Sequence, residues 1–181
     1  MTDSNPFLGA GDASSHENGI NFAIASALSQ VSVAIPVKIM SVSGGGVGPP
    51  GAVSVQPLIQ MVDGIGQTPT PHGVINNIPF TRGQGSGNVI INDPVVGDVG
   101  LMVVAHRDIS SLKSNNGAIS SPGSRRTHDL ADGIYIGSLV MQTTPTNYIN
   151  MNGGNISIVS AGTVTVTAPN IKINGTVDIN S

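Results

Sequence analysis

The sequence predicts an all-β protein with one short N-terminal helix, a small barrel and a repetitive β-solenoid tail. Val and Ile occur 20 times each whereas Leu occurs 7 times, and 24 Gly and 12 Pro interrupt the apolar runs. This composition is typical of strands cut by turns. Short apolar runs separated by glycine-rich loops fill residues 35–110, and residues 147–181 repeat a unit of strand and turn.

Charge is scarce in this chain. Seven Lys and Arg and ten Asp and Glu make up 9% of the residues and give a formal net charge of −3. Without a basic tract, electrostatic binding to nucleic acid or to an anionic membrane is not expected. Cysteine is absent, which excludes disulfides, thiolate zinc sites and cysteine nucleophiles. So many β-branched residues with so few charges would leave a monomer poorly protected against strand-edge aggregation.

Residues 1–34 are expected to form an N-terminal arm with a short helix. Ser15 is a candidate cap, and the apolar residues that follow it have helical spacing: Ile20, Ala23, Ile24, Ala27 and Leu28. Pro36 would end such a helix by about Ile35. The helix either packs on its own domain or serves as a docking arm, and the sequence leaves both interpretations open.

Residues 35–110 are expected to form the barrel. Apolar alternation predicts strands over 37–42, 53–62, 74–80 and 88–91, and the most apolar strand over 99–105, with 83–87 as a flexible connector. About five short strands in a hundred residues favour a small closed or partly open barrel. Residues 111–146 are expected to be an irregular connector that closes the barrel and contains a strand at Gly133–Ile136.

The tail, residues 147–181, repeats pairs of apolar residues at steps of 7, 8, 7 and 6. Each unit reads as a short strand with alternate residues apolar, followed by a turn, as in a β-solenoid. Five such rungs cannot enclose a core alone, so we expect a homotrimer in which three copies wind about one axis. The expected trimer core is Ile149, Met151, Ile156, Ile158, Val164, Val166, Ile171, Ile173, Val177 and Ile179. The residues expected to point outward are Ser157, Thr163, Thr165, Thr167, Lys172 and Asp178.

Catalytic and metal-binding patterns are missing from the sequence. The histidines, at 16, 72, 106 and 128, form no HxH, HxxxH or HExxH arrangement, and each is expected in a loop or in a partly buried hydrogen bond. No Gly-x-Ser-x-Gly elbow and no phosphate-binding loop occur. Asp63, Asp93, Asp98 and Asp132 accompany Gly or Pro and are expected to serve turns. We therefore expect no enzyme, no cofactor and no metal.

One local cluster of basic residues stands in the connector. Arg125, Arg126 and His128 could bind an anion, but solvated side chains or salt bridges between subunits are favoured. Aromatic residues make up only 3% of the chain, which is too few for platforms that stack nucleic-acid bases.

Several segments, taken in their order along the chain, resemble the N-terminal barrel of a family of phage proteins. These are the central-spike proteins of contractile-tailed phage baseplates, of the Mu-like "baseplate assembly protein V" type. They are Val53–Ile59, Ile78–Phe80, Asp93–Leu101 with Ala105–Asp108, and His128–Gly133, and the repetitive tail from Asn147 is similar to the triple-stranded β-helix of that family. The resemblance covers about residues 25–181. The positions that carry it in the barrel are Val53, Val55, Pro57, Leu58, Ile59, Pro79, Phe80, Gly97, Asp98, Gly100 and Leu101.

The resemblance implies an OB-fold-like barrel followed by a short triple-stranded β-helix in a homotrimer. It implies a structural protein of the virion, assembled in the host cytoplasm, that contacts the baseplate hub and tail tube and transiently crosses the host outer membrane. Many family members bind iron at their tip through a His-x-His motif, but no histidine follows His128 here. An apical metal is therefore not expected. Because the last rung would otherwise expose unpaired strand edges and the ends of Val177 and Ile179, we expect a separate tip-capping protein at the C-terminus.

Two other classes of function remain open at this point. One is an OB module that binds an oligosaccharide or a nucleic acid and is trimerised by its tail, against which the shortage of aromatic and basic residues counts. The other is an enzyme fused to a β-helix, against which it counts that no second domain of enzyme size fits into 181 residues. Within the structural class, the sequence does not separate a phage tail from a bacteriocin or secretion-type injection device.

Overall fold

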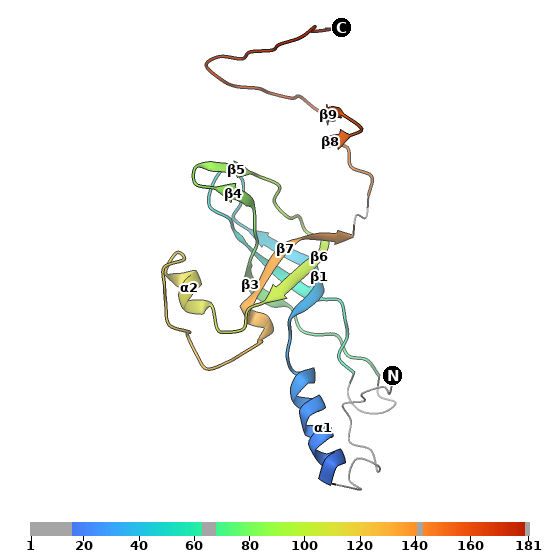
Figure 1. Cartoon of the computed structure of the whole chain (residues 1–181), viewed down its shortest axis with the longest axis vertical. Coiled ribbons are helices and arrows are strands. Elements are labelled where there is room, and N and C mark those ends of the chain that lie inside the picture. The colour runs from blue at the N-terminus through green and yellow to red at the C-terminus, as the bar shows by residue number, and fades with distance from the viewer. Residues whose placement is uncertain (1–15, 63–67, 141–142, 180–181) are drawn as a thin grey trace. The chain divides into compact units, whose positions relative to one another are not determined.

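A computed structural model of the chain describes residues 16–62, 68–140 and 143–179 (Figure 1). The structure is mostly β and divides into two compact units, residues 1–142 and 143–181. Asp63, expected in a turn, lies outside the described residues. None of the helices in the described part is long and apolar enough to cross a membrane.

The first unit is built on a curled five-stranded sheet, a half-barrel (Figure 1). Its strands are β1 (Ala34–Ser43), β2 (Ala52–Pro57), β3 (Ile75–Pro79), β6 (Val99–Val104) and β7 (Gly133–Val140), in the order β3-β2-β1-β6-β7. Neighbouring strands are antiparallel. The sheet curls until its two edges meet: Phe80 forms a parallel bridge with Tyr135, and the N–H of Thr81 donates to the Tyr135 carbonyl at 3.0 Å.

The core lies inside this curl and comes from alternate residues of the strands, because successive side chains of a strand point to opposite faces. In β2, for example, Val53, Val55 and Pro57 are buried, while the residues that alternate with them, Ser54 and Gln56, are only half-buried. The buried apolar residues of the described chain are Val37, Ile39, Val53, Val55, Ile78, Phe80, Met102 and Tyr135. This small core is confined to the half-barrel.

The N-terminal helix is present as α1 (His16–Ser29), with Glu17 in its first turn. It ends well before Pro36, because β1 begins at Ala34 and pairs with β6 from its first residue. Next to this junction, the Val33 carbonyl accepts a hydrogen bond from the N–H of Val104 in β6, at 2.8 Å. No residue of α1 is buried.

The structure corrects four expectations about the first unit. The strand expected over 53–62 ends at Pro57, and Leu58 and Ile59 are exposed beyond it. The expected connector at 83–87 is part of a hairpin, in which β4 (Gly83–Gly85) pairs with β5 (Asn88–Ile90). The strand expected at Gly133–Ile136 extends to Val140 as β7 and is the fifth strand of the sheet. The irregular connector also contains two short helices, α2 (Ser110–Ser114) and the 3-10 helix η1 (Leu130–Asp132).

The second unit contains a single hairpin, in which β8 (Tyr148–Asn152) pairs with β9 (Asn155–Val159). Residues 160–179 form neither helix nor strand in the single chain. The first two predicted rungs are therefore strands, whereas the units at 164–166, 171–173 and 177–179 are not. A strand requires a hydrogen-bonding neighbour, and this chain by itself supplies none to those units.

Candidate functional site

The apolar residues of the tail form the largest set of exposed large hydrophobic side chains at regular spacing in the described chain. In the hairpin, Ile149 lies opposite Ile158 and Met151 lies opposite Ile156. Residues that face each other across an antiparallel pair project to the same side, so these four side chains share one face. The opposite face carries Asn150 and Ser157, which also face each other.

All ten residues predicted for the trimer core are exposed in the single chain. Their exposed fractions run from 54% at Val164 to 86% at Ile179. Scattered exposed apolar residues are ordinary on a protein surface, but these ten recur in pairs at regular steps along the tail, and four of them share one face of the hairpin. The tail is therefore the candidate functional surface of this chain, and its chemistry is that of apolar association.

The described charges of residues 143–179 are Lys172 and Asp178, and both belong to the set expected to point outward. The remaining polar residues of the tail are mainly Thr, Ser and Asn. A surface of this kind can associate through apolar burial and backbone hydrogen bonds.

The barrel-motif residues differ in how far the structure buries them. Val53, Val55, Pro57 and Phe80 are buried, and Gly100 is buried in β6 against the ring of Tyr135. Pro79 and Leu101 are half-buried, whereas Leu58 and Ile59 lie outside the sheet and are exposed. Most of the motif therefore builds the half-barrel and does not present a binding surface.

Gly97 and Asp98 of the same motif form the turn that leads into β6. Gly97 has a φ of +100°, in the region that favours glycine, and the Asp98 carboxylate accepts a hydrogen bond from the Val95 N–H at 2.9 Å. The expectation that Asp98 serves a turn is confirmed.

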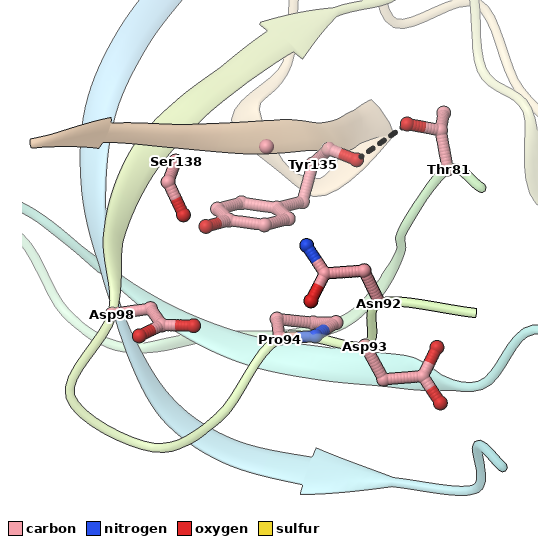
Figure 2. Close-up of a pocket in the computed structure, with 8 residues that line it drawn as sticks. Thr81, Asn92, Asp93, Pro94, Asp98, Tyr135 and Ser138 are labelled. Carbon is pink, nitrogen blue, oxygen red and sulfur yellow. Dashed lines mark hydrogen bonds between the residues drawn. The ribbon is translucent and has the colours of Figure 1, made fainter. Parts of the chain in front are cut away.

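A polar pocket of about 120 Å³ opens beside β7 (Figure 2). Its lining residues are Thr81, Asn92, Asp93, Pro94, Asp98, Tyr135, Gly137 and Ser138. In this view the Tyr135 hydroxyl lies beside the Ser138 hydroxyl, and the Asp98 carboxylate lies below them. The Tyr135 hydroxyl is buried and has no hydrogen-bond partner among the described residues. Burial raises the pKa of the Tyr135 hydroxyl above its usual value, and the neighbouring Ser138 side chain partly offsets this effect.

The two carboxylates of this pocket are already engaged by the protein. Asp98 holds the turn described above, and Asp93 accepts from the Arg82 guanidinium through both oxygens, each at 2.7 Å. The Asp93 carboxylate also accepts from the Gly46 N–H at 2.7 Å. The hydrogen bonds from Arg82 and then from Gly46 hold the pKa of Asp93 below its usual range. The pocket therefore has no free general base paired with a nucleophile.

A second ion-pair cluster corrects the expectation for Arg126 and Asp132. The Arg126 guanidinium binds the Asp132 carboxylate at 2.7 and 2.8 Å and the Asp108 carboxylate at 3.0 Å. Arg126 is thus paired within its own chain, and Asp132 is a fully buried ion-pair partner. Sequence reasoning missed the cluster because Asp108 is 18 residues from Arg126 and no local pattern joins them.

The carboxylates of this cluster are strongly acidic. Hydrogen bonds from the Ser110 side chain and N–H, with the charge of Arg126, lower the pKa of Asp108 to about 2. The hydrogen bond from Arg126 holds the pKa of Asp132 below its usual range, and in return the pKa of Arg126 is raised. The cluster joins the residues after β6 to the connector before β7, so its role is to fix the end of the half-barrel.

Two histidines meet in a hydrogen bond, as expected, whereas His16 is the exposed first residue of α1 and not a loop residue. His106 Nδ1 and His128 Nε2 are 2.9 Å apart, and His128 Nδ1 lies 3.1 Å from the Ser32 carbonyl. At His72 it is the backbone carbonyl that accepts a hydrogen bond, from the side-chain amide of Gln56. Among the described residues, no group of three or more His, Asp or Glu is arranged to hold a metal ion.

In comparisons with known proteins, no family matches this chain, and no curated protein matches it.

Proposed function

We propose that this chain is a homotrimeric structural protein, the central spike of a contractile tail baseplate. It would cap the tail tube and hub and be driven through the host outer membrane when the sheath contracts. The observation that carries the proposal is the regular array of ten apolar side chains in the tail, all more than half exposed in the single chain. Such an array requires a partner surface, and the repeat suits a like copy best.

The hairpin explains why like copies are required. A two-stranded hairpin alone is at best marginally stable in water, and β8–β9 leaves Ile149, Met151, Ile156 and Ile158 on one uncovered face. Three copies about one axis would bury these faces against each other and give the units after residue 160 the neighbouring strands that they lack.

The first unit supports the same proposal through its strand order. The sheet has the order β3-β2-β1-β6-β7, and a parallel contact joins its edges at Phe80 and Tyr135. This order supports the proposal that the half-barrel is a five-stranded OB-type barrel. An OB-type barrel followed by a repetitive β tail is the arrangement that the sequence resemblance implies. The barrel would contact the hub and tail tube, and the tail would form the triple-stranded β-helix.

The mechanism in this proposal is mechanical, and the protein breaks no covalent bond. Strands cross-paired between three chains can separate only if many hydrogen bonds break together, so the tail resists unravelling under load. A surface of Thr, Ser and Asn costs less to move through lipid than a charged one.

The oligomeric state of the full chain tests this proposal. We expect light scattering to give the mass of a trimer, and the trimer to resist dissociation in SDS without heating. The double substitution Ile171→Asp and Ile173→Asp should yield monomers, because it buries charge in the trimer core. The matched control, Thr163→Asp with Thr165→Asp, alters residues expected to point outward and should remain a trimer.

Two results would overturn the proposal. A monomeric wild-type chain at micromolar concentration removes the trimer and the function built on it. Equal trimer yields from both double variants would show that Ile171 and Ile173 do not face the trimer axis.

A further inference from the structure

We propose that the imidazoles of His106 and His128 form a two-nitrogen binding site for a divalent transition-metal ion that prefers square-planar or octahedral coordination, Cu²⁺ or Ni²⁺. The site lies at the end of the half-barrel, where the residues after β6 meet the connector before β7. It goes beyond the proposed spike function and does not depend on it, because both histidines belong to the first unit of one chain.

The two ring nitrogens face each other across a short gap. His106 Nδ1 lies 2.9 Å from His128 Nε2, and the rings meet edge to face with their centroids 4.8 Å apart. Bonds from a metal ion to imidazole nitrogen are about 2.0–2.1 Å long. Two nitrogens in neighbouring positions of a square-planar or octahedral ion are therefore about 2.9 Å apart, whereas a tetrahedral ion requires about 3.3 Å. The observed separation fits Cu²⁺ or Ni²⁺ better than tetrahedral Zn²⁺.

The other nitrogen of the His128 ring determines which atom is free to bind. His128 Nδ1 lies 3.1 Å from the Ser32 carbonyl oxygen. Because a carbonyl group only accepts, Nδ1 carries the proton of the neutral ring and Nε2 carries the lone pair. Metal-binding histidines almost always donate their second ring N–H to a carbonyl, a carboxylate or water in this way. His128 thus has the tautomer and the outer hydrogen bond of a metal ligand.

His106 becomes the second ligand through a change of tautomer. Since His128 Nε2 carries the lone pair, His106 Nδ1–H donates to it in the absence of an ion. When the ion binds, the proton of His106 moves from Nδ1 to Nε2 by exchange with water, to which this residue is exposed. His106 Nδ1 then takes up the metal, and two water molecules leave the hydrated ion. Two neutral rings release no net proton in this step.

The backbone holds the two histidines next to each other. The His128 N–H donates to the His106 carbonyl at 3.4 Å, and their neighbours Arg107 and Thr127 form an antiparallel bridge. His128 also has a φ of +53°, in the left-handed region, which is a costly conformation for a residue other than glycine. Such a conformation persists only where the surrounding contacts determine it. The ligand pair is therefore preorganised, and the exposed His106 ring can adjust to the ion.

The site is open and has few protein ligands. In the part of the chain that the structure describes, no third His, Asp or Glu joins the pair, so water fills the remaining positions of the ion. Binding should therefore be weaker than at closed sites with four protein ligands. A bound ion would still join the residues after β6 to the connector, and by mass action it should stabilise the folded first unit.

Calorimetric titration of the metal-free full-length protein with NiCl₂ tests the proposal. We expect one ion per chain and a rise in Tm at saturating Ni²⁺. His106→Gln removes one ligand at an exposed position and should weaken binding by at least about tenfold, because the chelate is lost. His16→Gln, at an exposed histidine outside the pair, is the matched control and should bind Ni²⁺ as the wild type does.

Electron paramagnetic resonance of the wild-type protein with one equivalent of Cu²⁺ is a second measurement that needs no variant. The spectrum should show coupling to two imidazole nitrogens, and that of His106→Gln should not. Equal Ni²⁺ binding by His106→Gln and the wild type would mean an adventitious ion only and would overturn the proposal, as would a wild-type Cu²⁺ spectrum without the two nitrogens. Light scattering on the same samples reports on the spike proposal separately, because a monomer that binds the ion overturns the trimer and leaves the metal site standing.

Discussion

Arg82 and Asp93 form a bidentate ion pair, in which Nε donates to Oδ1 and Nη2 donates to Oδ2, both at 2.7 Å. The Arg82 side chain is 1% exposed, and its Nη1 donates to the Gly48 carbonyl while Asp93 accepts from the Gly46 N–H. One ion pair therefore fixes the glycine-rich loop between β1 and β2 against the residues that flank the β4–β5 hairpin. This loop is held in place even though its sequence is typical of a flexible segment.

The first prediction concerns this ion pair. Arg82→Met removes three hydrogen bonds and leaves Asp93 without its cation, so the thermal midpoint Tm should fall by more than about 5 °C. Hydrogen exchange in residues 44–51 should become faster. Arg125→Met, at an exposed arginine, serves as the control and should leave both measurements unchanged; equal losses in the two variants would contradict the assignment.

The second prediction concerns acid stability. The pKa of Asp108 is lowered to about 2, chiefly by hydrogen bonds from Ser110, and the pKa of Asp132 is lowered by Arg126. A carboxyl group with a depressed pKa in the folded state stabilises the fold above its unfolded value of about 3.9, and this contribution is lost as the pH falls through the folded pKa. Tm should therefore fall steeply between about pH 4 and pH 2.

The variant Asp108→Asn cannot titrate at this position, so its Tm at pH 7 should be lower and should fall less between pH 4 and pH 2. Asp178→Asn, in the tail and outside the cluster, is the matched control and should follow the wild-type profile. Parallel profiles for Asp108→Asn and the wild type would show that the cluster does not contribute to acid unfolding.

The third prediction concerns Tyr135, whose ring packs in the core and whose hydroxyl has no hydrogen-bond partner among the described residues. Tyr135→Phe keeps the ring and removes a buried, unpaired polar group, so Tm should stay the same or rise slightly. Tyr135→Leu leaves a cavity beside Gly100 and should lower Tm by several degrees. A large loss of stability in Tyr135→Phe would mean that the hydroxyl makes a bond, for example to Ser138.

The half-barrel was predictable because its strands carry local signals. Val37 and Ile39, Val53 and Val55, and the run around Met102 alternate with less buried neighbours, and each pattern lies within one short segment. The prediction failed where local pattern and tertiary pairing diverge. Leu58 and Ile59 continue an apolar run, yet β2 ends at Pro57 and only the Leu58 N–H still donates to β1, at the Pro36 carbonyl. Gly83–Gly85, in contrast, has a flexible sequence but pairs with β5.

Contacts distant in the sequence were not predictable from it. Arg126 is recognisable as a basic residue, but its pairing with Asp108 and Asp132 depends on how the connector folds back past the end of β6. The tail shows the opposite situation. Its repeat is plain in the sequence, but only the first two units form strands, in the β8–β9 hairpin, and no strand of the described chain pairs with residues 160–179.

The last prediction follows from the charges of the tail. Residues 143–179 carry only Lys172 and Asp178, so the association of tails should depend on apolar burial and not on ion pairs. Screening by salt weakens contacts between exposed charges but not burial of apolar surface. The trimer fraction measured by light scattering at low protein concentration should therefore be the same at 1 M NaCl as at 0.05 M NaCl, or higher.

Ile156→Ser, which removes apolar surface from the hairpin face, should reduce this fraction at both salt concentrations, whereas Ser157→Ala on the opposite face should not. A trimer that dissociates as salt rises would place the dominant contacts among the charged residues of the first unit.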